Sequence, residues 1–250
     1  MCRGRDAAGG HPVTDGEKTP AEEHAPATRR LHAVDGLLGR REAISELGDA
    51  LRLLVEYATT TEAPTEELRR AAERIRQAAA PLGERVRDRE VLPTADDLLG
   101  GVRMYNPVTG SGSALAPPLH IAADNGVAVG TCTLGMAFEG PPTYAHGGVS
   151  AMLLDQMLGY AAGIAGHPGM TVRLDTTYRK PVPLLTPLRL TATVQDIDGR
   201  RVTATGQLTT ADDPDTVLVA ATGVFIALRA EQARRLFGRV VNTNRPSRAG

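Results

Sequence analysis

The chain has 250 residues, of which 42% are hydrophobic and 23% charged, and its formal net charge is −1. This length and hydrophobic content allow one well-packed core and a small second unit, whereas the balanced charge argues against a nucleic-acid-binding protein, which normally has a basic excess. Two cysteines, Cys2 and Cys132, are too few for a disulfide framework, and no segment has the pattern of a secretory signal or a membrane span. We therefore expect a cytoplasmic protein with no membrane span and no nucleic-acid partner.

The first part of the chain divides into a tail and a helical extension. Residues 1–28 mix glycine, proline and charged residues without periodicity, which predicts a disordered tail. Within residues 29–92, apolar side chains recur at helical spacing over 40–58 and again over 65–87. These segments predict a helical hairpin that packs on the main domain, pairs with its copy in an oligomer, or acts as a lid.

Residues 93–229 form the predicted main domain, in which short extended segments flank one long helix. The Asn125-Gly126 pair between two apolar segments predicts a tight hairpin turn. Strands are predicted over residues 102–106, 119–123, 127–137, 170–180, 187–196, 201–211 and 216–228. This order predicts an α+β fold in which an antiparallel sheet wraps around the helix. Residues 230–250 are expected to form a short helix, 230–237, and a polar tail.

The long helix begins near Ala145 and is apolar around nearly its whole circumference, which predicts that it is buried. His146 and Gly147 open this helix, and the N–H groups of its first turn have no partner within the helix. Asp155 follows eight residues after Gly147, which is about 12 Å along the helix axis. One reacting carbon cannot contact both groups. Either they act separately, or two helices lie antiparallel and the site forms only in a dimer.

These residues resemble a known family, the hot-dog fold thioesterases, and in particular its PaaI-like and THEM-like acyl-CoA thioesterase branch. The similarity rests on His146-Gly147-Gly148 with Asp155 on a buried helix, on the later Tyr178-x-x-Pro181 stretch, and on the meander of strands, and it covers residues 98–228. It implies an acyl-CoA substrate, thioester hydrolysis without metal or other cofactor, and a homodimer or a dimer of dimers with antiparallel central helices.

The resemblance also implies roles for individual residues. The Gly147 N–H polarises the thioester carbonyl in one subunit, and Asp155 of the other subunit activates water or attacks directly. His146 helps to hold the thioester, and Thr171 corresponds to a hydroxyl residue that orients the water. One departure is that relatives often have Asn or Gln about six residues before the histidine, where this chain has Gly140.

A second group of residues is expected to bind substrate. Gly148 and Met152 belong to the same helix as the reacting groups, and Arg179 and Lys180 are placed to meet the phosphates of coenzyme A. The alternative is that these two basic residues are simply exposed to solvent at the end of a strand and bind nothing.

Several rival functions are weighed against the thioesterase. A serine hydrolase based on Ser150 would need a Gly-x-Ser-x-Gly elbow, which the sequence lacks. A hot-dog hydratase would need a catalytic histidine in a His-x-x-x-x-His or Asp-x-x-x-x-His arrangement, which the sequence also lacks. His120 and His167 have no partners at metal-ligand spacing. A non-catalytic acyl-CoA-binding protein on the same fold stays open, as does a scaffold function of the hairpin. Acyl chain type and the choice between coenzyme A and acyl carrier protein also stay open.

Overall fold

The computed structural model describes residues 21–97, 101–229 and 231–232. The chain divides into two compact units, residues 1–39 and 40–250. Helix α1 (Ala21–Thr60) crosses the boundary between these units, and the remaining elements all belong to the second unit. The predicted tail therefore overlaps α1 over residues 21–28, and residues 1–20 lie outside the described part.

Two helices precede the sheet. A short loop, residues 61–64, joins α1 to α2 (Thr65–Gly83), and Pro64 caps the start of α2. The described α1 is longer than the predicted helix over 40–58, because periodicity detects only an apolar stripe. Residues 21–39 are rich in the helix-forming residues Ala, Leu, Glu and Arg without forming such a stripe.

Six strands form one sheet in which all neighbours are antiparallel. They are β1 (His120–Asp124), β2 (Val127–Thr133), β3 (Met170–Tyr178), β4 (Pro187–Asp198), β5 (Arg201–Thr210) and β6 (Val219–Ile226). Their spatial order is β1-β2-β4-β5-β6-β3, so β1 and β3 form the two edges. The predicted strand over 102–106 is wrong, because that segment consists of turns with one isolated bridge, between Asp97 and Val102.

Local sequence explains the turns and faces of this sheet. Asn125 and Gly126 both have positive φ, 48° and 82°, as the predicted tight turn between β1 and β2 requires. In β4 the apolar members of the alternating pattern, Leu188, Leu190 and Ala192, are buried. One face of the sheet therefore packs inward and the other carries polar side chains.

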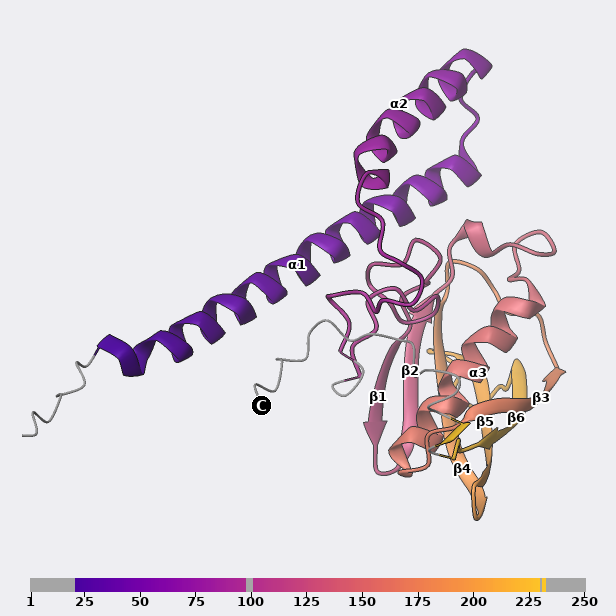
Figure 1. Ribbon diagram of the computed structural model, residues 1–250. Coiled ribbons are helices and arrows are strands. Elements are labelled where there is room, and N and C mark those ends of the chain that lie inside the picture. Colours follow the sequence, from indigo (N-terminus) through magenta and orange to yellow (C-terminus); the bar gives the residue numbers. More distant parts are fainter. Residues whose placement is uncertain (1–20, 98–100, 230, 233–250) are drawn as a thin grey trace, which may run out of the picture. The chain divides into compact units, whose positions relative to one another are not determined.

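Helix α3 (Gly147–Ile164) lies along the inward face of the sheet and contacts β2, β3, β4, β5 and β6 (Figure 1). Its fully buried side chains include Leu153, Leu154, Met157 and Leu158. The prediction of an antiparallel sheet wrapped around a long buried helix, preceded by a helical hairpin, is confirmed. Of the predicted final helix over 230–237, only residues 231–232 are described.

Candidate active site

The turn before α3 is fixed by backbone hydrogen bonds on both sides. The Ala145 N–H donates to the Val182 carbonyl, and the His146 N–H donates to the Phe138 carbonyl, both at 2.9 Å. His146 is the N-cap of α3, and its Nδ1 accepts from the Gly148 N–H at 3.0 Å. Nδ1 is therefore unprotonated in this arrangement, and Nε2 carries the ring proton. The exposed His146 ring thus presents an N–H donor at the mouth of the turn.

The Gly147 N–H has no hydrogen-bond acceptor among the described residues, as expected at the first position of a helix. Next to it, the hydroxyl of Tyr178 donates to the Gly147 carbonyl at 3.0 Å. A Cβ on residue 147 would lie 3.3 Å from the Tyr178 ring, so the two residues are in close contact. Tyr178 is the residue that sequence reasoning named only as part of a motif, without a role of its own.

The Asp155 carboxylate is half-buried on α3, two turns after Gly147. The Thr171 hydroxyl at the start of β3 donates to its Oδ1 at 2.9 Å. No basic side chain among the described residues forms an ion pair with Asp155. The structure thus brings together two of the predicted site residues, with Thr171 bound to the carboxylate of Asp155 in the same chain.

Strand β3 connects the two halves of this constellation. Thr171, its second residue, binds Asp155, and Tyr178, its last residue, binds Gly147. Because β3 is an edge strand, its outer edge lacks a neighbouring strand in the described chain. Four hollows lined by described residues have volumes between about 380 and 690 Å³, and none of these four is lined by Gly147, Asp155 or Thr171. Within one chain these groups face an open surface, whereas substrate sites are normally concave.

The loop before the turn explains the departure from the family pattern at Gly140. A Cβ on residue 140 would lie 2.7 Å from the His146 Cα, so an amide side chain has no space at this position. In the same loop Thr143 has φ of 71°, a strained conformation for a β-branched residue. Its N–H donates to the Glu139 carboxylate at 2.8 Å, which holds the loop in place.

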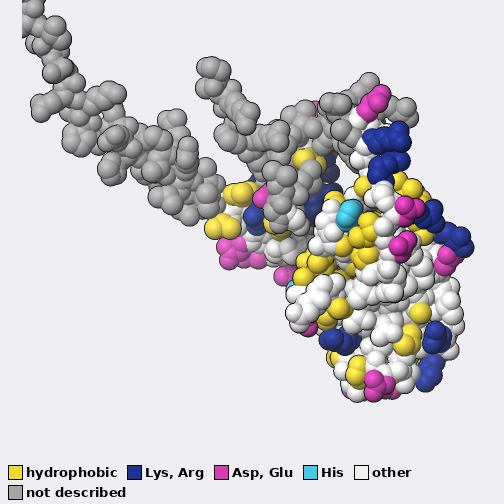
Figure 2. All heavy atoms as spheres, turned by 90° about the horizontal axis from the view of Figure 1, so that it is seen from below, with side chains coloured by type: hydrophobic (Ala, Val, Ile, Leu, Met, Phe, Trp, Pro, Cys, Tyr) yellow, Lys and Arg dark blue, Asp and Glu magenta, His cyan; other side chains and the backbone are white. Residues whose placement is uncertain are grey.

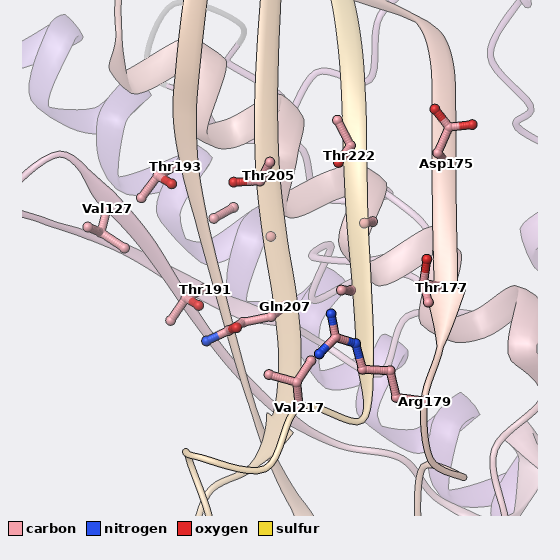
Figure 3. A pocket seen from close by; sticks show the side chains of 14 residues that line it. Val127, Asp175, Thr177, Arg179, Thr191, Thr193, Thr205, Gln207, Val217 and Thr222 are labelled. Atoms are coloured by element: carbon pink, nitrogen blue, oxygen red, sulfur yellow. The ribbon is translucent and has the colours of Figure 1, made fainter.

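The other predicted substrate-binding residues lie in three different settings. Gly148 has its N–H occupied by His146, and Met152 is half-buried against the core. Arg179 lines the hollow on the outer face of the sheet, with α3 behind the strands (Figure 3), and Lys180 is exposed. The structure thus places Arg179 on the opposite face of the sheet from Asp155.

Three further features of the described residues concern the binding of charged partners, metal ions and membranes. On the face shown in Figure 2, acidic and basic side chains are interspersed and neither sign covers the surface. Among the described residues, no three His, Cys, Asp or Glu side chains gather as a metal site would require. In the same part of the chain, no helix combines the length and apolar character that crossing a bilayer demands.

Comparison with known proteins shows which family this chain is similar to. The model of the thioesterase superfamily matches residues 143–217. A crystal structure of a thioesterase superfamily protein is 38% identical, with a TM-score of 0.65, and the match covers 73% of this chain and 94% of that one.

Curated relatives match over a shorter stretch. Acyl-coenzyme A thioesterase THEM4 of Mus musculus is 34% identical over 98 residues, which is 39% of this chain and 42% of the mouse protein. The Xenopus laevis protein of the same name is 34% identical over 94 residues, 38% of this chain and 42% of that protein. The chain therefore spans less than half the length of the curated relatives it matches.

Proposed function

This chain belongs to the thioesterase superfamily, and we propose that it hydrolyses the thioester of an acyl-CoA to the free acid and coenzyme A. The observation that carries the proposal is that Asp155, hydrogen-bonded by Thr171 of β3, lies on the same helix as the open Gly147 N–H. The named activity of the mouse and frog relatives, acyl-CoA thioesterases, supports the substrate class.

We propose that the working site lies between two copies of the chain. Gly147 and Asp155 are about 12 Å apart along α3, too far for one thioester carbon to reach both. If two β3 strands pair antiparallel about a two-fold axis between Leu174 and Asp175, Thr171 of one copy lies opposite Tyr178 of the other. Since Thr171 binds Asp155 and Tyr178 binds Gly147, this pairing brings the carboxylate of one copy to the N–H of its partner.

The exposed side chains of β3 agree with this pairing. Met170 is 48% exposed and Val172 58% exposed on an edge strand of nine residues. An edge strand with exposed apolar side chains is a site for adding another strand, and a copy of β3 satisfies its backbone groups.

The chemistry follows from what these groups can donate and accept. The Gly147 N–H, assisted by the His146 Nε2–H, donates to the thioester oxygen as negative charge develops, which can contribute roughly 3–4 kcal/mol. The free oxygen of Asp155 removes a proton from water while that water attacks the carbonyl carbon. The tetrahedral intermediate then expels the thiolate of coenzyme A, which takes the proton back from Asp155. Thr171 fixes the carboxylate, and Tyr178 fixes the Gly147 peptide.

We place the protein in the cytoplasm, because the free thiol of Cys132 in β2 fits a reducing compartment. The substrate-binding roles of Gly148, Met152, Arg179 and Lys180 belong to the same proposal. Arg179 and Lys180 would contact the phosphates of coenzyme A and not the reacting carbonyl.

The test is thiol release from a panel of acyl-CoAs by the wild type and by Asp155→Asn, which keeps the shape and removes the base. The proposal predicts turnover by the wild type and a loss of roughly a hundredfold or more in the variant, with the oligomeric mass unchanged. If the wild type binds acyl-CoA but hydrolyses none of the panel, the protein is instead a non-catalytic acyl-CoA-binding protein.

A further inference from the structure

Helix α1 docks on its own domain through polar groups. Arg41 donates from Nε to the Ala95 carbonyl at 2.8 Å, and Arg52 donates to the Ser111 carbonyl at 2.8 Å. Glu56 accepts from the Met136 N–H at 3.0 Å. These side chains recur at helical spacing, so one polar face of α1 is used for this contact. Ile44 also packs on the domain, because its Cγ2 would lie 2.3 Å from a Cβ on Gly112, whereas Leu47 and Tyr57 stay exposed.

Most large apolar side chains of the hairpin stay exposed. Leu47 and Tyr57 on α1 are 43% and 62% exposed. On α2, Leu68 and Ile75 are 46% and 41% exposed, and no residue of this helix is buried. An amphipathic helix gains most of its stability by packing its apolar face. Ile44 of the predicted α1 stripe packs on the domain, whereas the exposed members of both stripes are left for another helix to cover.

A groove lies between the two helices, which run beside each other in Figure 1. Its volume is about 660 Å³, and its apolar lining comes from both helices. The lining includes Leu54, Tyr57 and Ala58 of α1 and Leu68, Ala72 and Ile75 of α2. Small alanines between large apolar side chains allow another helix to approach closely.

The charged rim of this groove points to the occupant. On α2, Glu66 pairs with Arg69 and Glu73 pairs with Arg76. Three charged residues that line the groove, Glu67, Arg70 and Arg74, form no ion pair with any described residue. The rim thus carries unpaired charges of both signs, which does not suit a partner of uniformly acidic or uniformly basic surface.

We propose that the groove receives the same hairpin of a second copy of this chain, so that two hairpins form a four-helix bundle. Glu67 and Arg74 are seven residues apart and therefore lie on one flank of α2. In an antiparallel two-fold arrangement, this flank of α2 contacts the same flank of the second copy, and the two helices run in opposite directions. Glu67 of each copy then faces Arg74 of the other, while the stripes containing Leu68 and Ile75 pack in the middle.

This interface is separate from the β3 edge. Hairpin pairing buries the extension and leaves α3 and β3 untouched, so it goes beyond the proposed hydrolysis and does not depend on it. If both interfaces form, four chains assemble as two β3-paired dimers joined through their hairpins.

The first experiment measures the mass of the full-length protein by sedimentation equilibrium, for the wild type and for Leu68→Glu. The matched control is Leu53→Glu, because Leu53 is also on the hairpin and 53% exposed but does not line the groove. We expect Leu68→Glu to halve the mass and Leu53→Glu to leave it unchanged. Far-UV circular dichroism spectra should be equal in all three proteins, which shows that the variants are folded whether or not the chain hydrolyses acyl-CoA.

The second experiment tests self-complementarity by charge exchange. Glu67→Arg alone and Arg74→Glu alone should each shift dissociation to higher protein concentration, because like charges then face each other. Mixing the two single variants should restore the wild-type behaviour, since one copy then carries two arginines and the other two glutamates at the rim.

Each outcome decides the proposal. If Leu68→Glu halves the mass, from four chains to two or from two chains to one, hairpin pairing is supported. A change from two chains to one would also show that the β3 strands of two copies do not pair. Equal masses for the wild type and Leu68→Glu would overturn the proposal, and so would a mixture of charge variants that stays dissociated like its components.

Discussion

At the scale of single residues, the hydroxyl of Thr171 has one visible task, which is to donate to Asp155. We predict that Thr171→Val lowers kcat roughly ten- to a hundredfold, because a hydrogen bond to a charged group contributes about 1.5–3 kcal/mol. Thr171→Ser keeps the donor and should retain most of the activity. Steady-state kinetics of both variants on one acyl-CoA checks this, and equal losses in the two would show that the methyl group matters and not the hydroxyl.

Cys132 leads to a prediction about pH. Burial in β2 raises the pKa of its thiol from 9.0 to about 12. Between these values the unfolded chain loses the proton and the folded chain keeps it, so the free energy of unfolding falls as pH rises. Above pH 9 the free energy of unfolding should fall by about 1.4 kcal/mol per pH unit because of this group. Below pH 9 the group should contribute nothing to the pH dependence.

Urea unfolding at several pH values between 8 and 11 measures this slope. Cys132→Val removes the titrating group while keeping an apolar side chain, so its stability should lack this part of the pH dependence. Parallel curves for the wild type and the variant would contradict the prediction.

At the scale of elements, Gly48 shows how closely α1 approaches the domain. A Cβ there would lie 2.2 Å from the Ser111 carbonyl oxygen. Gly48→Ala should therefore destabilise the protein, by roughly 1–3 kcal/mol as in other overpacked sites, although alanine is the better helix former. Gly83→Ala is the matched control, because nothing lies within 4 Å of its Cβ and alanine should be neutral or slightly stabilising. Chemical denaturation of both variants gives the comparison.

The elements also show which features the sequence predicts and which it does not. The alternation in β4, the Asn125-Gly126 turn and the all-round apolar α3 each had a single physical interpretation, and each was confirmed. The segment over 102–106 resembled a strand by composition alone, but it makes turns held by other parts of the chain. Its Met104 N–H donates to the buried Asp96 carboxylate at 2.8 Å, a contact that no local pattern encodes.

In the candidate site, too, some features could be predicted from the sequence and others could not. Asp155 and Gly147 were predicted from their spacing and helix environment, whereas the role of Tyr178 depends on where the end of β3 meets the start of α3. The hairpin was predicted from its two apolar stripes. That α1 would dock through Arg41 and Arg52 and leave Leu47 and Tyr57 exposed could not be predicted, because an apolar stripe does not show which face of a helix contacts the domain.

At the scale of the whole molecule, the shared site makes a prediction about mixtures. Asp155→Asn keeps the Gly147 N–H, and Gly147→Pro removes that N–H at the first helical position, where proline is tolerated. Each variant alone should be nearly inactive. A refolded equal mixture should recover roughly a quarter of the wild-type activity, because half of the dimers are mixed and one of their two sites is complete.

Activity of the mixture decides whether two copies share a site. A mixture no more active than its components, with mixed dimers demonstrated by mass, would place Asp155 and Gly147 of one chain in separate functions. Mixing before and after refolding supplies the control for subunit exchange.

The position of both reacting groups on one rigid helix, α3, has a consequence for inheritance. In the proposed dimer each α3 serves two sites, giving its N–H to one and its carboxylate to the other. A chain that lacks both groups would therefore silence both sites of any dimer that it enters, even when its partner is intact. Co-expressed with the normal chain, such a double variant would behave as a dominant allele, whereas either single change would leave half of each mixed dimer at work.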